Sequence, residues 1–154
     1  MLPLQLVRRS RFLAGALLLG ILAGCAGVRN REPTPELDVF GVELGSTADH
    51  RSIRGVVVVE EPCLRGYERF FEALDFSVGY DPSGRVRKVT TRNPATRVWG
   101  IRPGDSLSAA REMATRAGFT EKGAPHRFEK DGRRLTLLAD ESGRVFGLTL
   151  EAEN

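Results

Sequence analysis

Two segments of this chain recur with the same offset of 59 residues. Residues 40–45 (FGVELG) correspond to residues 99–104 (WGIRPG), and residues 81–86 (DPSGRV) correspond to residues 140–145 (DESGRV). Each copy therefore opens with an aromatic–Gly–aliphatic pattern and reaches Asp-x-Ser-Gly-Arg-Val about 41 residues later. A common offset for two separate matches favours a duplication, although the middles of the copies match poorly.

The second copy predicts one helix followed by three strands. Asp105 or Ser106 can cap a helix by accepting backbone N–H bonds, and the apolar positions over 107–117 recur at helical spacing. Gly118 can end that helix. Short apolar runs separated by turn residues then predict a meander. Its strands are expected at 126–129, 135–139 and 145–150.

The first copy predicts the same ending and a poorer helix. Strands at 76–80 and 86–91 should flank a turn at 81–84, and a short helix is expected at 47–54. Residues 56–60 (VVVVE) are either a buried strand or the strand end of that helical segment. Residues 67–74 (YERFFEAL) are ambiguous between helix and strand.

Each unit is therefore interpreted as a helical segment packed on an antiparallel hairpin or meander. Two such units can join their sheets edge to edge. The sequence predicts an α+β fold of two tandem units, at about 40–92 and 99–151, with the helices on one face of the sheet.

The N-terminus has the layout of an export signal. Arg8, Arg9 and Arg11 precede an uncharged apolar run at 12–24, which has 13 residues. A helix needs about 20 apolar residues to cross a bilayer, so this run suits the apolar region of a signal peptide instead. The run ends in Leu22-Ala23-Gly24-Cys25, and these four residues resemble a bacterial lipobox.

That resemblance implies cleavage between Gly24 and Cys25 and acylation of Cys25. Lipid chains contribute about 0.8 kcal/mol per buried methylene, and two or three chains hold a protein at a membrane. Ala26 at the following position implies, by analogy, the outer membrane facing the periplasm. The alternatives are an uncleaved anchor, or an ordinary signal peptide with a chance cysteine.

The chain thus divides into a signal peptide (1–24), a lipidated cysteine with a flexible tether (25–37) and a soluble α+β domain (38–154). Over 99–151, and more faintly over 40–92, the capped helix, Gly-Phe exit and Asp-x-x-Gly-x-Val turn resemble two protein families. These are the SmpA/OmlA lipoproteins of outer-membrane assembly and the β-lactamase-inhibitor protein. The resemblance implies action through a protein surface rather than through chemistry.

Charge and motifs exclude several function classes. Without its first 24 residues the chain has 20 basic and 20 acidic residues, so it lacks the basic footprint of a nucleic-acid-binding protein. It has no nucleophile elbow, phosphate-binding loop or metal-ligand spacing, and we predict no cofactor and no metal. His50 and His126 are isolated, and Cys63 is either a buried thiol, an intermolecular disulfide or, least favoured, a catalytic thiolate.

Two kinds of side chain are candidates for a surface role. Trp99 and Phe40 open the two copies and are either buried core residues or partner anchors. The arginines around the predicted turns could bind lipid head groups or an acidic protein, or could be solvated strand surface. These arginines are Arg85, Arg87, Arg133, Arg134 and Arg144.

The sequence therefore predicts a non-catalytic envelope lipoprotein that binds or scaffolds another protein. The alternative is a module that binds lipid or cell-wall fragments. The expected partners are membrane lipid through Cys25 and an envelope protein, with no nucleic acid, while the oligomeric state and the residues that bind the partner stay open.

Overall fold

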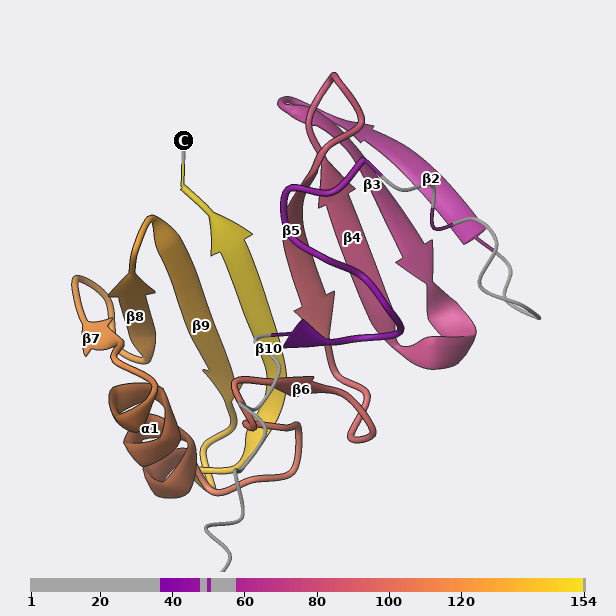
Figure 1. The fold of residues 1–154 in the computed structure, drawn as a ribbon. Coiled ribbons are helices and arrows are strands. Elements are labelled where there is room, and N and C mark those ends of the chain that lie inside the picture. Colours follow the sequence, from indigo (N-terminus) through magenta and orange to yellow (C-terminus); the bar gives the residue numbers. More distant parts are fainter. Residues whose placement is uncertain (1–36, 48–49, 51–57, 154) are drawn as a thin grey trace, which may run out of the picture. The chain divides into compact units, whose positions relative to one another are not determined.

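A computed structural model describes residues 37–47, 50 and 58–153 (Figure 1). The predicted signal peptide, the cleavage site Gly24–Cys25 and nearly all of the tether lie outside the described residues. Within them are ten strands, one α-helix and a 3-10 turn, η2, at Glu72–Leu74. The helix is α1 (Leu107–Arg116), and the strands are β1 (Leu37–Asp38), β2 (Val58–Cys63), β3 (Gly66–Phe71), β4 (Phe76–Tyr80), β5 (Val86–Thr91), β6 (Arg97–Val98), β7 (Thr120–Glu121), β8 (Arg127–Lys130), β9 (Arg133–Ala139) and β10 (Val145–Ala152).

Eight of the strands form one antiparallel sheet in the order β2-β3-β4-β5-β10-β9-β8-β7. The first half of the sheet, β2 to β5, and the second half, β7 to β10, each follow chain order and meet where β5 pairs with β10. A separate pair joins β1 to β6. In the described part of the chain, β2 and β7 are the outer strands of the sheet.

The predicted α+β class of two helix-plus-hairpin units is wrong. The described chain is mostly β, with a single α-helix beside the eight-stranded sheet. The ambiguous residues 67–74 form most of β3, in which Tyr67, Arg69 and Phe71 share one face, and only Glu72–Leu74 turn as η2. Of the apolar run at 56–60, residues 58–60 begin β2, which is exposed from Val59 to Cys63, so the interpretation of this run as a buried strand is wrong. The helix expected at 47–54 falls mostly outside the described residues.

The predicted helix of the second copy is present, and its cap is Ser106. The Ser106 hydroxyl accepts the Ala109 N–H at 3.3 Å, and Gly118 follows the helix with a φ of 89°. A positive φ there is typical of the residue that ends a helix. Local capping signals are therefore sufficient to place α1.

The 59-residue offset recurs in the backbone hydrogen bonds. Each Asp-x-Ser-Gly-Arg-Val segment ends in a valine that is bonded to the glycine segment of its own copy. In the first copy Gly45 N bonds to Val86 O (2.8 Å) and Val86 N bonds to Ser46 O (2.8 Å). In the second copy Gly104 N bonds to Val145 O (2.7 Å) and Val145 N bonds to Asp105 O (2.9 Å). The β4–β5 and β9–β10 hairpins also each have an irregular register at corresponding places, between Gly79 and Tyr80 and between Val145 and Gly147.

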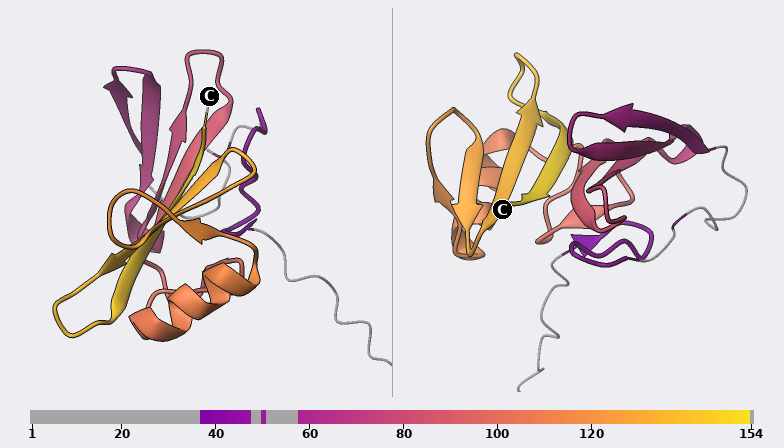
Figure 2. Two further views of the ribbon diagram at one scale, coloured as in Figure 1. Left: turned by 90° about the vertical axis from the view of Figure 1, so that its left-hand side faces the viewer. Right: turned by 90° about the horizontal axis from the view of Figure 1, so that it is seen from above.

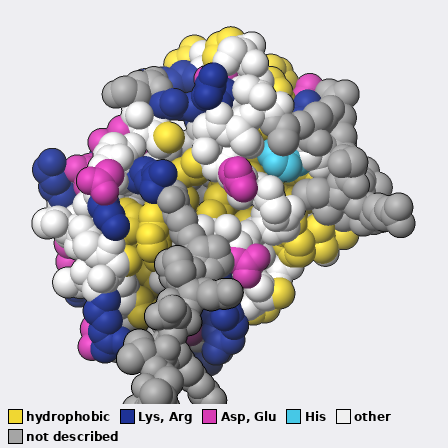
Figure 3. Space-filling model, in the orientation of Figure 1, with side chains coloured by type: hydrophobic (Ala, Val, Ile, Leu, Met, Phe, Trp, Pro, Cys, Tyr) yellow, Lys and Arg dark blue, Asp and Glu magenta, His cyan; other side chains and the backbone are white. Residues whose placement is uncertain are grey.

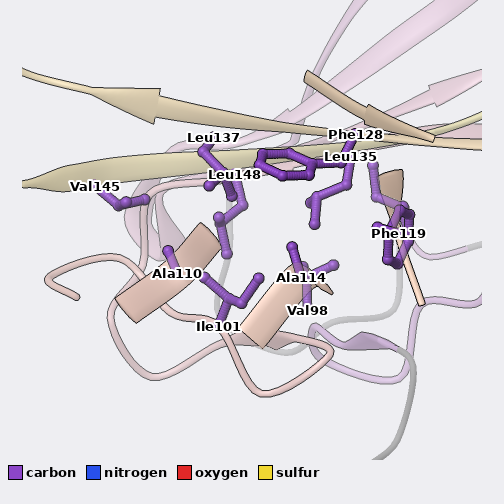
Figure 4. Packing of buried hydrophobic residues seen from close by; sticks show 11 residues of the cluster. Val98, Ile101, Ala110, Ala114, Phe119, Phe128, Leu135, Leu137, Val145 and Leu148 are labelled. Atoms are coloured by element: carbon purple, nitrogen blue, oxygen red, sulfur yellow. The ribbon is translucent and has the colours of Figure 1, made fainter. Parts of the chain in front are cut away.

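The apolar core lies on one face of the sheet. Ala110 and Ala114 of α1 pack against strand residues of the second half (Figure 4), and the segments around β1 and β6 cover the rest of that face. Figure 2 shows α1 and β1 on the same side of the sheet. Because Leu150 of β10 lies directly opposite Val89 of β5, the two apolar clusters share this face.

The outer strand β2 has the features that discourage pairing with a further strand. Glu60, Glu61 and Pro62 follow one another along it, and all three are exposed. Proline has no N–H to donate, and carboxylates resist burial in a sheet.

Candidate binding groove on the open face of the sheet

The face opposite α1 carries two rows of mostly polar residues and is not covered by any described helix. Directly opposite residues in antiparallel strands point to the same face, so the pairing register defines the rows. Along the first row the charges alternate in sign. The first row contains Glu68, Gly79, Lys88, Glu151 and Arg134, and the second contains Phe70, Ser77, Thr90, Thr149 and Thr136.

Two hollows lie on this face, and both touch β4. The larger, of about 1050 Å³, lies toward the Tyr80 end of β4, and the smaller, of about 310 Å³, lies toward its Phe76 end. Among the residues that line the larger hollow are Cys63, Arg65, Glu68, Arg87 and Lys88. Glu68 and Lys88 line both hollows and stand between them, and the two hollows are together called the groove.

Gly79 leaves room for an ion pair between these two side chains, the Glu68–Lys88 bridge. Lys88 and Glu68 flank Gly79 from the two neighbouring strands, and Lys88 Nζ lies 3.4 Å from the Glu68 carboxylate. A Cβ at Gly79 would lie 3.2 Å from Lys88 Cβ, which is tighter than ordinary packing. Ser77, the next residue of β4 on this face, donates its hydroxyl to Glu68 Oε1 at 2.7 Å. Two small side chains therefore form the floor of the groove.

The second half of the sheet has larger side chains at the corresponding places. At an offset of 59 residues, Thr136 replaces Ser77 and Leu138 replaces Gly79. In the second half the glycine lies on β10 instead, where Gly147 is opposite Leu138 of β9. A Cβ at Gly147 would lie 3.2 Å from Leu138 Cδ1. The small residues at the floor of the groove are thus specific to the first half, although Arg134, Glu151 and Glu153 of the second half also line the larger hollow.

The cations around the larger hollow differ in their partners. Arg134 pairs with three carboxylates, those of Glu129, Glu151 and Glu153. Arg87 donates Nη2 to the Ala152 carbonyl at 3.2 Å. Among the described residues Arg65 has no ion pair, and it is exposed at the β2–β3 turn. Its guanidinium is therefore available to an anionic group.

The Asp-x-Ser-Gly segments are hairpin turns, as predicted. Asp81 Oδ1 accepts the Ser83 hydroxyl at 2.6 Å and the Arg85 N–H at 2.9 Å, and Asp140 makes the same bonds with Ser142 and Arg144. These bonds, that of the serine hydroxyl first, lower the pKa of both aspartates. Asp81 also lies at the margin of the larger hollow.

A second polar cluster lies on the core face, where Arg69 and His50 are buried and Glu60 is exposed. Arg69 is 5% exposed, its guanidinium lies 5.0 Å from the ring centre of Tyr67 and 4.9 Å from that of Tyr80, and its Nε donates to Glu60 at 2.7 Å. Burial would lower the pKa of Arg69, but hydrogen bonds to Glu60 and Tyr80 outweigh it and raise that pKa. The buried His50 places Nδ1 2.9 Å from the Tyr80 hydroxyl. This cluster ties β2, β3 and β4 together.

The structure separates the other candidate residues. Cys63 is exposed, so its interpretation as a buried thiol is wrong. The residues lining the larger hollow include Cys63 but neither histidine. Within the described residues there is no group of three or more His, Cys, Asp or Glu side chains that could hold a metal ion.

The two aromatic residues that open the copies are partly exposed. Trp99 is half-buried against Phe119, with ring centres 4.7 Å apart. Phe40 is 38% exposed and stacks on Phe76 at 5.0 Å. Both therefore pack on the core while keeping one side in solvent.

The five candidate arginines do not form one site. Arg87 and Arg134 line the larger hollow, whereas Arg85 donates to the Gly45 carbonyl and Arg133 lies over the Trp99 ring. Basic and acidic side chains are interspersed on the face shown in Figure 3. The sequence prediction missed Glu68, Ser77, Gly79 and Lys88. The small residues at alternating positions of 76–80 (FSVGY) were the available signal.

Comparison with protein-family models, curated proteins and solved structures found no match to this chain. No helix in the described part of the chain has the length and apolar character needed to cross a bilayer.

Proposed function

We propose that this chain is a lipid-anchored lipoprotein of the bacterial envelope whose folded domain binds another protein without catalysis. The observation that carries the anchoring is the order of features before Cys25. Basic residues, a 13-residue apolar run and Leu-Ala-Gly-Cys follow one another as export and acylation require. The outer membrane, facing the periplasm, is the proposed location.

The groove on the open face supports the binding role. It is wide, open and lined by charged side chains of both signs, which suits a polar partner surface. The Glu68–Lys88 bridge is partly exposed, at 21% and 35% of the two side chains, and such pairs contribute about 0–1 kcal/mol. A partner can therefore replace this bridge at small cost.

Cys25→Ser tests the anchor. The wild-type chain should fractionate with membranes, label with radioactive palmitate and accumulate as a precursor when the lipoprotein signal peptidase is inhibited with globomycin. The variant should carry no label. Normal processing in globomycin, or a wild-type product that remains unlabelled, would refute the lipoprotein proposal.

Crosslinking from the groove tests the binding role. A photoreactive amino acid at Thr90, on the groove wall, should yield a discrete crosslinked envelope protein in intact cells. The same amino acid at Ser108, which is exposed on α1, is the matched control. Equal crosslinking from both positions would place the binding surface elsewhere, and a crosslink from Ser108 alone would exclude the groove.

A ligand-binding module for lipid or cell-wall fragments is the second candidate. It is favoured by the volume of the larger hollow, about 1050 Å³, which is slightly above the usual upper limit of about 1000 Å³ for small-molecule sites. Lipid or glycan fragments co-purifying with the membrane-extracted chain, and lost on Lys88→Ala, would favour this candidate over a protein partner.

A further inference from the structure

Leu64 is an apolar side chain that the described fold leaves entirely in solvent. It is 102% exposed, whereas the other exposed large apolar side chains of the described residues are 37%, 38% and 43% exposed and so more than half covered. Leu64 lies in the two-residue loop of the β2–β3 hairpin, since Cys63 pairs with Gly66. Such loops usually carry Gly, Asn, Asp or Ser, which favour the turn itself. Neither packing nor turn formation therefore explains a leucine here.

The residues beside Leu64 extend this projecting apolar surface. Pro62 and Cys63 precede it and are both exposed, and Arg65 follows it, exposed and with no ion pair in the described part of the chain. The base of the loop is closely packed, because a Cβ at Gly66 would lie 1.9 Å from a carbonyl oxygen of β4. Residues 62–65, here called the β2–β3 tip, are therefore presented from a fixed base.

A bilayer suits the β2–β3 tip better than a protein pocket does. Leucine is under-represented among the side chains that dominate protein interfaces. Apolar side chains beside a cation match the boundary of a bilayer, where Leu64 can enter the edge of the acyl chains while the Arg65 guanidinium binds a lipid phosphate. Residues 25–36 could span at most about 40 Å, roughly three times the radius of gyration of about 13 Å expected for such a domain. The proposed lipid anchor therefore leaves the tip within reach of the membrane.

The charges around the tip limit what it can recognise. Glu61 lies just before the tip on β2, and Asp81 and Arg87 line the larger hollow together with Cys63 and Arg65. Since acidic and basic groups offset each other, we expect the contact to depend on Leu64 and not on the anionic lipid content. Burial of one leucine shifts a binding equilibrium by roughly 10- to 100-fold, which is enough only for a chain already tethered to the membrane.

We infer that the β2–β3 tip dips into the surface of the bilayer that holds the chain, with Leu64 inserted and Arg65 at the lipid phosphates. This inference goes beyond the proposed protein-binding role and rests on the proposed lipid anchor. Because Cys63 and Arg65 also line the larger hollow, the contact sets that hollow at the membrane surface. A partner bound in the hollow then meets the lipid head groups as well.

The test measures how far water reaches the tip on a membrane. The acylated chain is purified from membranes and bound to the outside of vesicles of phosphatidylethanolamine and phosphatidylglycerol. Acylation of Cys25 leaves Cys63 as the one free thiol, and Cys63 receives the fluorophore nitrobenzoxadiazole. Dithionite, which stays in water, reduces this fluorophore where it is exposed. We expect reduction at least about fivefold slower than for the same label on the control Cys63→Ser/Ser108→Cys, because Ser108 is exposed on α1.

Leu64→Asn and Phe146→Asn are the matched variants. Both remove an exposed large apolar side chain, and only Leu64 belongs to the tip. Asparagine is an ordinary turn residue, so the β2–β3 hairpin should still fold. Leu64→Asn should bring reduction of the Cys63 label to within about twofold of the control label, whereas Phe146→Asn should leave the protection intact. Both variants should float with the vesicles, and phosphatidylcholine vesicles should protect the unsubstituted tip equally.

Equal reduction rates at the two label positions overturn the inference. Full protection in Leu64→Asn also overturns it, because the fluorophore itself would then be the inserted group. An unprotected label, together with a discrete protein crosslinked from a photoreactive amino acid in place of Leu64 in intact cells, would assign the tip to a protein pocket instead.

Failure of the lipid anchor gives a different result. The Cys25→Ser chain with an N-terminal hexahistidine tag can be held on vesicles by a nickel-chelating lipid, without acylation. For a chain found unacylated in cells, protection of Cys63 on these vesicles would retain the affinity of the tip for a bilayer although the lipoprotein proposal had failed. An acylated chain that floats with an unprotected label would retain the anchor and overturn the inference.

Discussion

The hydroxyl oxygens of Thr90 and Thr149 lie 3.2 Å apart across the β5–β10 pair, and the two residues are 59 positions apart in sequence. They mark the centre of an internal two-fold relationship. Val89 faces Leu150, which corresponds to Thr91 at the 59-residue offset. Thr91 in turn faces Leu148, which corresponds to Val89. The two halves of the sheet therefore meet as equivalent strands.

This relationship predicts a strongly non-additive double substitution. Thr90→Val and Thr149→Val should each lower the free energy of unfolding by about 0.5–1 kcal/mol, the usual net contribution of one hydrogen bond. Because both variants remove the same bond, the double variant should be about as stable as either single variant. Urea unfolding of the four proteins measures this, and costs that simply add would show that the hydroxyls do not interact.

The two aspartate turns predict that the stability of the folded chain depends on pH, and that both turns contribute in the same direction. Their carboxyl pKa values are lowered in the folded state, so the stability they contribute is present above the unfolded pKa of about 3.9 and is lost as pH falls through the lower folded value. The double variant Asp81→Asn/Asp140→Asn should be less stable than wild type at pH 7 and should lose less stability on acidification. Urea midpoints at pH 7 and pH 3 test this, and parallel losses in the two proteins would contradict it.

Two phenylalanines that occupy corresponding core positions should be equally important. Phe71 lies opposite Phe76, and Phe128 lies opposite Leu135, and both side chains are almost fully buried. Phe71→Ala and Phe128→Ala should each cost about 3–5 kcal/mol, because truncation leaves a cavity. Phe146→Ala is the control, since Phe146 is 43% exposed, and a cost for it similar to that of the core variants would argue against this packing.

Gly66 should tolerate no side chain. It has a φ of 140°, and a Cβ there would lie 1.9 Å from the Tyr80 carbonyl oxygen. Gly66→Ala should therefore cost more than about 3 kcal/mol and disturb the β3–β4 pair. Gly132→Ala is the matched control, because it adds a Cβ at a positive φ with nothing within 4 Å, and should cost about 1–2 kcal/mol. Thermal unfolding compares the two, and similar losses would contradict the close approach at Gly66.

Local signals predicted part of this fold correctly. Ser106 and Gly118 bound a helix, and the Asp81 and Asp140 turns stand between strands, because each depends on hydrogen bonds or backbone angles within a few residues. The predicted fold class was wrong because it assumed a helical segment in each unit, whereas the described residues contain a single α-helix. Residues 67–74 satisfy helical and strand spacing alike and form mostly a strand. Pairing with β2 and β4 decides in favour of a strand. Such pairing is invisible in a short window of sequence.

The groove could not be predicted for the same reason. Glu68, Gly79 and Lys88 become neighbours only through the register of three strands, and Glu68 and Lys88 are 20 residues apart. The sequence showed charged residues in these strands without showing which would face each other. From the sequence, Cys63 and the arginines near the turns were the candidates instead. Of these, only Cys63, Arg87 and Arg134 line the larger hollow.

The exposed Glu60, Glu61 and Pro62 of β2 matter most if many copies are held on one membrane. Confinement to a surface raises the local concentration of a chain and orients its copies alike, which favours strand-by-strand growth from one sheet to the next. A proline that cannot donate and the exposed carboxylate of Glu61 beside it interrupt such growth at the place where it would begin. The outermost strand would thus keep a crowded two-dimensional layer of these molecules from polymerising into fibrils.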